Sequence, residues 1–489
     1  MGAFHGLEAA HYKALILPIL KKTEAWNHYY YPEISLVPMD PPRSLMTLPY
    51  ELRTQIGSYL CSVEERDTQK VLSQLTQTCK ALRDTFQPLL FRTYTHYSEP
   101  VSRLVSFLRA IVSRPDLAAA VTTVTFDSFL KPTGVTILEK EFIDTCISNL
   151  GLPVPAEDWH LEGTYRHLPV ETLLAYTPNI ESLTLPVNEE WNLDLLPAFL
   201  EASPKIEFPH LRSLSIYYYF IAGDRWAIDY GQIAPLLQAT SHLEHLSLPS
   251  LEGFWEGHEN PPIPRLDSLK TLDLGESGSG MFLITSLLKA CKVLRKFELY
   301  WLSSTGYDES HEDWSTLEVW DAIARLKKTI EEIIFEASSD IPLGRLTGDS
   351  VCSLSDFTKL RTLKVVGRSL EGMLQAWTLK TGNSDMDEFV AQLLPSGIRE
   401  LAIWFPSRDV IPALFALAKA KSQELYTDLT EVEIGPSPVF KEWLPRPEWP
   451  RNEAALREAF ARARVQLKME IPHVPPEMMN LAIQMGIAS

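Results

Sequence analysis

The chain has 489 residues, of which 45% are hydrophobic and 10% aromatic, so it can bury more core than one compact domain usually holds. Its 63 acidic and 45 basic residues give a formal net charge of -18, which disfavours a partner with a phosphate backbone. No basic stripe stands out, because Lys21-Lys22 and Lys327-Lys328 are only short pairs. We therefore expect a small module joined to a larger one, with no nucleic-acid partner.

The cysteines and the apolar segments indicate the compartment. The five cysteines are odd in number, scattered and free of any C-x-x-C spacing, which is typical of buried thiols in a reducing environment. The apolar segment from Ala14 to Leu20 is too short to span a bilayer and leads into two lysines instead of a small-residue cleavage site. These features predict a cytoplasmic or nuclear protein with no membrane partner.

Both ends of the chain are expected to be irregular. Residues 1–44 contain Tyr29-Tyr30-Tyr31 and the run Asp40-Pro41-Pro42, which is typical of an extension that ends in a linker. Residues 471–489 contain three prolines and are expected to form a loosely ordered tail.

A helical segment begins at Leu48-Pro49. The apolar residues Leu52, Ile56 and Leu60 recur on one helix face behind a proline in the first turn. A second apolar series keeps helical spacing, with Thr78 as a possible cap, and Pro88 is expected to stop it. That series is Val71, Leu72, Leu75, Cys79, Leu82 and Phe86.

Beyond residue 100 a unit recurs in which a helix-like stretch leads into a short strand with the pattern apolar-x-x-apolar-x-apolar. The starts of these strands lie 25 to 38 residues apart, except for the first pair, which is 59 apart and must contain an insertion, a helix around Val135 to Leu150. The ten copies begin at Val121, Ile180, Leu211, Leu243, Leu269, Leu294, Ile330, Leu360, Ile398 and Leu429.

Repetition at this period predicts an α/β solenoid, with a parallel inner sheet and outer helices. Helix candidates lie between the strands, and Ala454 to Arg462 with Val465 to Met469 is expected to form a last unit. A doubly wound or barrel-shaped α/β enzyme remains the alternative, because it also alternates strands with helices. The helix candidates are Ile233 to Ala239, Phe282 to Cys291, Leu317 to Leu326, Phe389 to Leu394 and Val410 to Ala420.

The stretch LMTLPYELRTQIGSYL, residues 45–60, followed by LTQTCKALRDTFQPLLFR, residues 75–92, resembles the F-box of fungal proteins. The resemblance implies a small helical bundle over residues 45–94 that docks on Skp1, the adaptor that leads to a cullin-RING ubiquitin ligase. The residues that it implies for Skp1 binding are Leu48, Pro49, Leu52, Ile56, Leu60, Leu75, Cys79 and Leu82. How they divide between the bundle core and the Skp1 surface is left open.

The repeats over residues 95–470 resemble degenerate leucine-rich repeats, the array most often joined to an F-box. The buried asparagine that follows each strand in that family is missing, and Tyr217, Pro249, Gly275, Tyr300 and Trp404 follow the strands instead. Together the two resemblances imply an irregular leucine-rich-repeat solenoid that binds an unknown protein target.

Strand alternation predicts which side chains form the inner face of the sheet. The first expected row is Ser182, Ser213, His245, Thr271, Lys296, Glu332, Thr362, Glu400 and Glu431. The second is Thr184, Ser215, Ser247, Asp273, Glu298, Ile334, Lys364, Ala402 and Glu433. The third is Pro186, Tyr217, Pro249, Gly275, Tyr300, Glu336, Val366, Trp404 and Gly435.

Acidic residues outnumber lysines on this face, so a basic target segment would suit it. We hypothesise that Tyr300 and Trp404 anchor the target while Glu298, Glu332 and Glu336 steer it, with Tyr217 and Asp273 on the same surface. The alternative is that the aromatic residues pack the edge and the acids are merely solvated.

No catalytic residues, cofactor or metal site are expected. The glycine-rich turn after Leu274 lacks the spacing of a phosphate loop, and His242 with His245 lacks further metal ligands. The F-box resemblance, with no catalytic motif beside it, implies the non-catalytic substrate receptor of an Skp1-cullin-F-box ubiquitin ligase. The alternative is a repeat scaffold of the same family that serves no ligase.

Overall fold

The computed structural model describes fifteen stretches of the chain, and the predicted extension 1–44 and tail 471–489 lie outside them. They are residues 45–61, 65–97, 100–126, 135–152, 168–187, 208–218, 228–249, 251–252, 262–277, 281–301, 316–337, 353–382, 384–404, 410–436 and 449–469.

The chain divides into two compact units, residues 1–56 and residues 57–489. The first contains a 3-10 turn, η1 (Leu45–Thr47), and the beginning of helix α2 (Tyr50–Cys61). This division falls inside the segment 45–94, so the F-box boundaries stay predictions.

Two helices follow in the second unit, α3 (Glu65–Thr78) and α4 (Lys80–Phe91), which pack against each other. Cys79 takes the N-cap position of α4 in an extended conformation, and Thr78 is the last residue of α3. The expectation that Pro88 ends the helix is wrong, because α4 continues to Phe91. A proline removes one backbone donor, and that loss is tolerable one turn before a helix ends.

A parallel sheet forms the centre of the second unit, and in the described residues it has twelve strands. All ten strands predicted from the template are present, as is the predicted last one, β14. The first strand, β1, was missed. The strands are β1 (Thr93–His96), β2 (Thr123–Phe126), β3 (Ser182–Val187), β4 (Ser213–Tyr218), β6 (His245–Ser247), β8 (Thr271–Ser277), β9 (Lys296–Trp301), β10 (Glu332–Ala337), β11 (Thr362–Val366), β12 (Glu400–Trp404), β13 (Glu431–Gly435) and β14 (Gln466–Met469).

The strand order follows the sequence from β1 to β14 without reversal. A doubly wound sheet would reverse its order at a switch point, so the sheet is instead compatible with a solenoid-like α/β repeat. A separate two-stranded parallel sheet joins β5 (Ile228–Asp229) and β7 (Leu251–Glu252).

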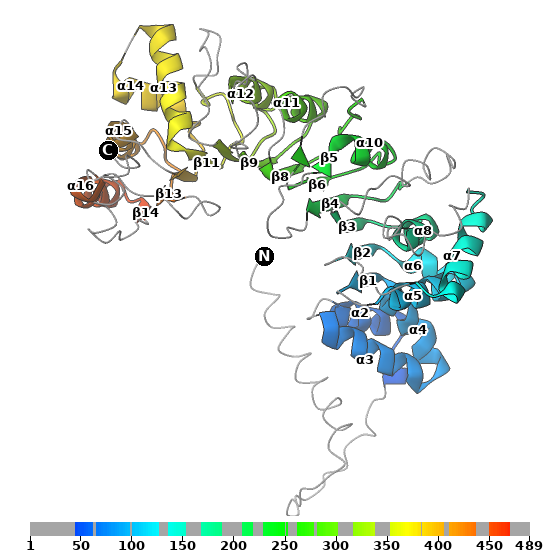
Figure 1. The fold of residues 1–489 in the computed structure, drawn as a ribbon. Coiled ribbons are helices and arrows are strands. Elements are labelled where there is room, and N and C mark those ends of the chain that lie inside the picture. Colours follow the sequence, from blue (N-terminus) through cyan, green and yellow to red (C-terminus); the bar gives the residue numbers. More distant parts are fainter. Residues whose placement is uncertain are drawn as a thin grey trace, which may run out of the picture. The chain divides into compact units, whose positions relative to one another are not determined.

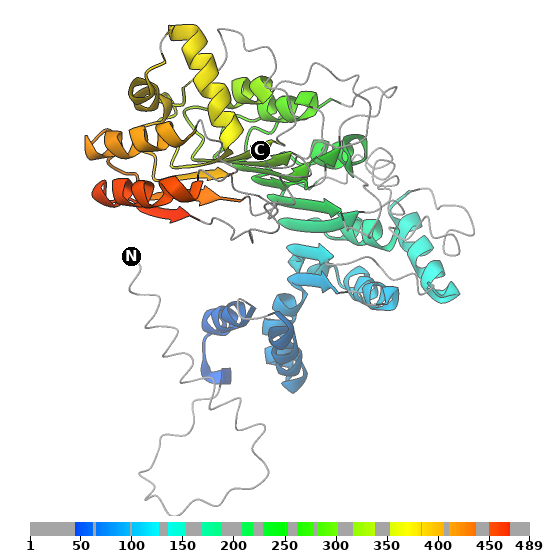
Figure 2. The ribbon, with the colours of Figure 1, turned by 60° about the vertical axis from the view of Figure 1, so that its left-hand side comes forward.

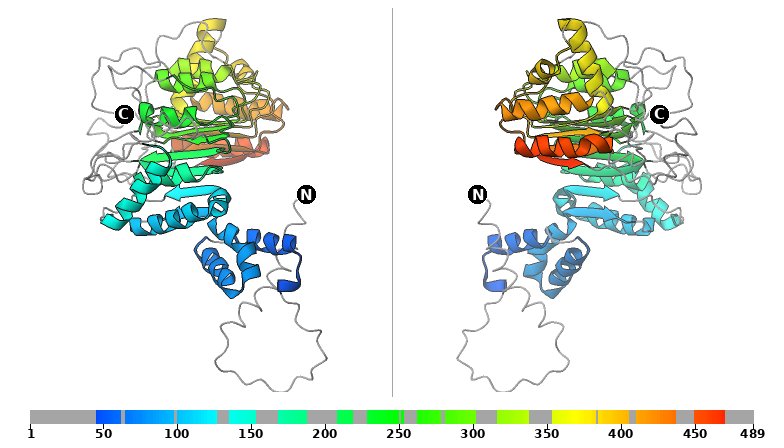
Figure 3. Two further views of the ribbon diagram at one scale, coloured as in Figure 1. Left: turned by 90° about the vertical axis from the view of Figure 1, so that its right-hand side faces the viewer. Right: turned by 90° about the vertical axis from the view of Figure 1, so that its left-hand side faces the viewer.

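The helices between the strands lie along one face of the sheet and run back beside it (Figures 1, 2 and 3). Their buried residues and the apolar strand positions form one continuous core from Tyr94 to Val465. No helix in the described ranges is long and apolar enough to cross a membrane. The helices are α5 (Val101–Ser113), α6 (Pro115–Ala120), α7 (Ile137–Asn149), α8 (Leu168–Tyr176), α10 (Tyr230–Gln238), α11 (Met281–Ala290), α12 (Thr316–Ala324), α13 (Gly367–Thr381), α14 (Met386–Leu393), α15 (Val410–Ser422) and α16 (Trp449–Arg462).

A backbone ladder joins consecutive repeats where each strand begins. The carbonyl before one strand accepts hydrogen bonds from two successive N–H groups of the next repeat, at 2.7 to 3.1 Å. Repetition of this junction holds the strands in register. The buried asparagines that follow the strands in leucine-rich repeats are missing from this sequence. The carbonyls belong to Arg92, Thr122, Glu181, Arg212, Glu244, Lys270, Arg295, Glu331, Arg361 and Arg399.

Candidate interaction surfaces

The segment around α2 carries several exposed apolar side chains. Pro49 directly precedes the helix, and its carbonyl accepts a hydrogen bond from the Arg53 N–H at 3.1 Å. Single exposed apolar side chains are common on protein surfaces, but a group of them close together in the chain is a candidate interaction site. They are Tyr50 (54% exposed), Met46 (43%), Leu52 (43%) and Tyr59 (42%).

The residues expected to bind Skp1 differ in exposure. Pro49 and Leu52 are exposed and Leu82 is buried, whereas the remaining five are half-buried: Leu48, Ile56, Leu60, Leu75 and Cys79. Met46, Tyr50 and Tyr59 were missed, although their position beside Leu48-Pro49 and on the same short helix could have indicated them.

Gly57 allows α4 to approach α2 closely. A Cβ at this position would lie 2.3 Å from Leu89 Cδ1 and 2.9 Å from Phe86 Cδ1. A larger residue at position 57 would have to displace the Leu89 and Phe86 side chains.

The pairing register confirms the first two predicted rows of the inner face. Ser182, Ser213 and His245 are direct partners in neighbouring strands, and the same register continues through Lys296 and Glu431. The second row is equally continuous, from Thr184 to Glu433.

The third row differs at β8, because the register shifts between Asp273 and Glu276. Gly275 has φ +47°, and its N–H donates a hydrogen bond to Asp273 Oδ1 at 2.9 Å. The result is a bulge that sets Glu276, not Gly275, opposite Tyr300. The strand template could not predict this extra residue.

The acidic residues in the middle of this face are partly neutralised. Lys296 Nζ lies 3.0 Å from Glu298 and 3.6 Å from Glu332. Burial lowers the pKa of Lys296, but Glu298 and Glu332 outweigh it and raise that pKa overall. Two of the expected steering acids therefore already share a lysine.

The Asp273 carboxylate accepts hydrogen bonds from residues of its own strand and of the neighbouring strand β6. Ser247 Oγ donates a hydrogen bond to Asp273 Oδ2 at 2.9 Å. Burial raises the pKa of Asp273, and the nearby Glu298 raises it further. Its carboxylate is thus less available to a target than the sequence suggested.

Tyr300 and Trp404, the expected anchors, lie together although 104 residues separate them. Their rings are stacked, with centroids 6.0 Å apart and an interplanar angle of 25°. Burial and Glu298 raise the pKa of the Tyr300 hydroxyl. Both rings belong to a small apolar cluster on the inner face, with Ile334, Val366 and Ala402.

The structure differs from the expected open surface at two positions. Trp404 is 2% exposed and Glu336 is 1% exposed. The indole Nε1 of Trp404 has no hydrogen-bond partner in the described residues.

Tyr217 lies apart on β4, where its hydroxyl donates a hydrogen bond to the Phe126 carbonyl at 2.8 Å and ties β4 to β2.

A charged surface that the sequence did not reveal lies at the amino ends of the strands. The four loops leading into β9 to β12 carry eight basic and two acidic residues, although the whole chain has a net charge of -18. We call these loops, residues 291–295, 325–331, 355–361 and 395–399, the basic edge. Its basic residues are Lys292, Arg295, Arg325, Lys327, Lys328, Lys359, Arg361 and Arg399.

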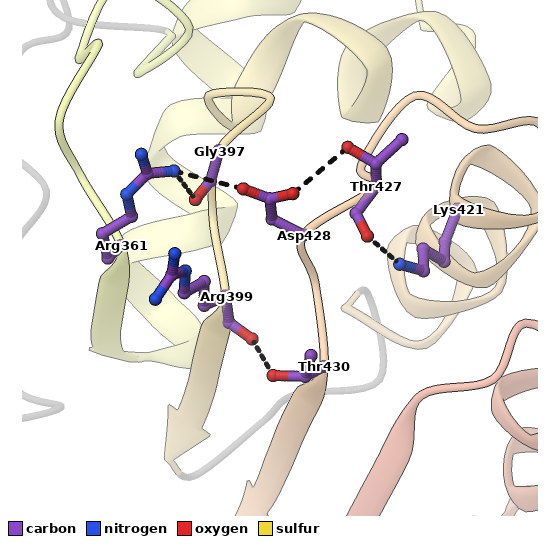
Figure 4. A network of polar contacts seen from close by, with 7 residues as sticks. All are labelled: Arg361, Gly397, Arg399, Lys421, Thr427, Asp428 and Thr430. Carbon is purple, nitrogen blue, oxygen red and sulfur yellow. Dashed lines mark hydrogen bonds and ion pairs between the residues drawn. The ribbon is translucent and has the colours of Figure 1, made fainter. Parts of the chain in front are cut away.

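Figure 4 shows the end of the basic edge at β11 and β12, together with the neighbouring loop that leads into β13. Arg361 Nη1 donates a hydrogen bond to the Gly397 carbonyl at 2.6 Å and lies 3.4 Å from Asp428 Oδ2. The carbonyl of Arg399 accepts a hydrogen bond from Thr430 Oγ1 at 3.2 Å. Lys421 Nζ donates to the Thr427 carbonyl beside them at 2.7 Å.

No group of three or more histidine, cysteine, aspartate or glutamate side chains in the described ranges could hold a metal ion. No known family model matches the chain, and no curated protein matches it. Among solved structures, a structural genomics target from Bacteroides fragilis is 11% identical, covering 67% of this chain and 72% of its own, with a TM-score of 0.33.

Proposed function

We propose that the chain is the substrate receptor of an Skp1-cullin-F-box ubiquitin ligase. Its N-terminal segment, an F-box by resemblance, would bind Skp1, and its repeat array, a degenerate leucine-rich-repeat solenoid by resemblance, would bind a target protein. The chemistry of ubiquitin transfer would occur on other subunits.

The observation that carries the proposal is the exposed apolar surface around the Leu48-Pro49 pair. Pro49, Tyr50 and Leu52 are exposed within a few residues of each other. Burying roughly 100 Å² of apolar surface per side chain would contribute about 2 kcal/mol each, before the costs of association. A cytosolic partner that covers this segment therefore fits its chemistry.

The repeat array supports the second half of the proposal. Its twelve parallel strands hold two rows of mostly polar residues in continuous register. Such a surface is typical of repeat proteins that bind other proteins. On it, the half-buried Tyr300 stays a proposed anchor for a target, and the buried Trp404 ring stacks against it.

The test is co-purification of the full-length chain with Skp1. The double variant Leu48→Ala, Pro49→Ala is expected to lose most of the bound Skp1, because it removes the apolar contacts at the start of α2. A matched control is Ile137→Ala, Leu138→Ala, which removes two strongly exposed apolar side chains from α7.

Failure of the wild-type chain to retain Skp1 would refute the F-box assignment. Recovery of Skp1 without a cullin would instead favour the scaffold without ligase function. Equal loss of Skp1 in both double variants would mean that binding does not depend on Leu48 and Pro49.

A further inference from the structure

The basic edge contains more positive charge than its own ion pairs neutralise. Four of its basic residues have acidic partners, through the pairs Lys292 with Asp267, Arg295 with Glu331, Lys327 with Asp356, and Arg361 with Asp428. The other four are exposed and have no ion-pair partner in the described residues. They are Arg325, Lys328, Lys359 and Arg399.

The unpaired residues precede three strands, β10, β11 and β12, that lie next to one another in register. The residues that precede the strands, Arg295, Glu331, Arg361 and Arg399, follow one another through the backbone ladder. Neighbouring strands are about 4.8 Å apart, so the edge from β9 to β12 spans roughly 15 Å. That length matches about five residues of an extended peptide.

Helix dipoles account for only part of this charge. Arg325 and Lys328 follow the carboxyl end of α12 at Ala324, where basic residues stabilise a helix. Arg399 lies well beyond the end of α14 at Leu393 and directly before β12. Its guanidinium carries five donors that suit a carboxylate in a bidentate arrangement.

We propose that the basic edge binds an acidic protein segment, one rich in aspartate or glutamate. Arg399 would receive a carboxylate beside β12, Lys359 beside β11 and Lys328 beside β10, with Arg361 held in place by Gly397 and Asp428. A short acidic peptide suits this surface better than a nucleic acid, because acidic residues interrupt the edge and the net charge of -18 repels a long polyanion. This proposal stands without the proposed ligase function.

The experiment measures fluorescence anisotropy with the full-length chain and a labelled peptide of alternating glutamate and glycine, about twelve residues long. Binding of the wild-type chain is expected to weaken as the salt concentration rises from about 50 to about 300 mM, because exposed charges are screened. A single-stranded oligonucleotide of equal charge serves as the second probe and is expected to bind more weakly.

Charge-reversal variants distinguish peptide binding at the basic edge from a general effect of the net charge. Lys328→Glu, Arg399→Glu is expected to weaken peptide binding about tenfold or more. The matched control Lys70→Glu, Lys80→Glu changes the net charge equally on α3 and α4 and is expected to change binding less than twofold.

A third variant guards against loss of folding. Asp428→Asn removes the acidic partner of Arg361 and is expected to tighten peptide binding about twofold, a gain that a damaged fold would not give. The proposal is overturned if the wild-type chain does not bind the peptide, if the oligonucleotide binds more tightly, if both charge reversals act equally, or if Asp428→Asn does not tighten binding.

Discussion

His96 is a buried imidazole at the end of β1, and it makes stability depend on pH. It is 0% exposed, its Nε2 has no partner in the described residues, and its Nδ1 lies 3.3 Å from the Tyr94 hydroxyl. Burial, with a smaller contribution from Arg103, lowers the pKa of His96 to about 4. The ring is therefore neutral in the folded chain at neutral pH.

The sign of the effect follows from proton linkage. An unfolded histidine has a pKa of about 6.5, so between about pH 6.5 and 4 the unfolded chain binds the extra proton. We expect His96 to reduce the free energy of unfolding by about 2 kcal/mol between pH 7.5 and pH 5. In urea titrations at pH 7.5 and pH 5, the variant His96→Phe should not show this loss of unfolding free energy. The variant His242→Gln, at an exposed position, should still show it. An unchanged pH dependence in His96→Phe would contradict the assignment.

Gly275 sets the bulge in β8, and its replacement should be costly. A Cβ there would meet Pro249 Cβ at 2.6 Å and Pro249 Cα at 3.0 Å, in a backbone conformation with positive φ. Gly275→Ala is expected to lower the free energy of unfolding by about 3 kcal/mol, from strain and overpacking together. Gly151→Ala is the matched control, because φ is +75° there and nothing lies within 4 Å of the new Cβ. Gly151→Ala should lower the free energy of unfolding by about 1 kcal/mol. Equal reductions in the two variants would show that Pro249 moves freely.

At the scale of elements, the strand template predicted what depends on local apolar spacing and missed what depends on neighbours. All ten template strands formed, and the apolar positions of each are buried in one continuous core. β1 was missed because Thr93-Tyr-Thr-His lacks that pattern, although its pairing with β2 places Tyr94 opposite Val124. The bulge at Gly275 was missed because Pro249, from the preceding repeat, helps to fix it.

The candidate surfaces show the same limit. The rows of the inner face could be predicted since strand alternation is local, but the pairing of Lys296 with two glutamates and the burial of Trp404 could not. The basic edge was missed because its residues are about 30 positions apart in sequence and only repeat stacking brings them together. Alignment of the repeats at their strand starts would have shown a charged residue before most strands.

For the molecule as a whole, charge is unevenly distributed, and the composition alone concealed this. A net charge of -18 argued against a partner with a phosphate backbone, and no basic stripe stood out in the sequence, yet the repeat geometry gathers eight basic residues along one edge. A solenoid sorts residues by their position within the repeat, so each row can carry its own charge. The overall composition therefore constrains the local surface charge of a solenoid less than that of a compact domain.

The same repeat geometry predicts how stability varies along the sheet. β9 pairs with β8 and β10, whereas in the part of the chain that the structure describes β14 pairs with β13 alone. A repeat at the end has one interface to stabilise it, so it opens more readily than a central one. In hydrogen exchange followed by mass spectrometry, backbone amides of β14 should exchange at least about tenfold faster than those of β9. The variant Phe460→Ala, which removes a buried ring of α16, should accelerate exchange in β14 and leave β9 unchanged. Equal exchange in both strands would mean that the array opens as a single cooperative unit, without graded stability from end to centre.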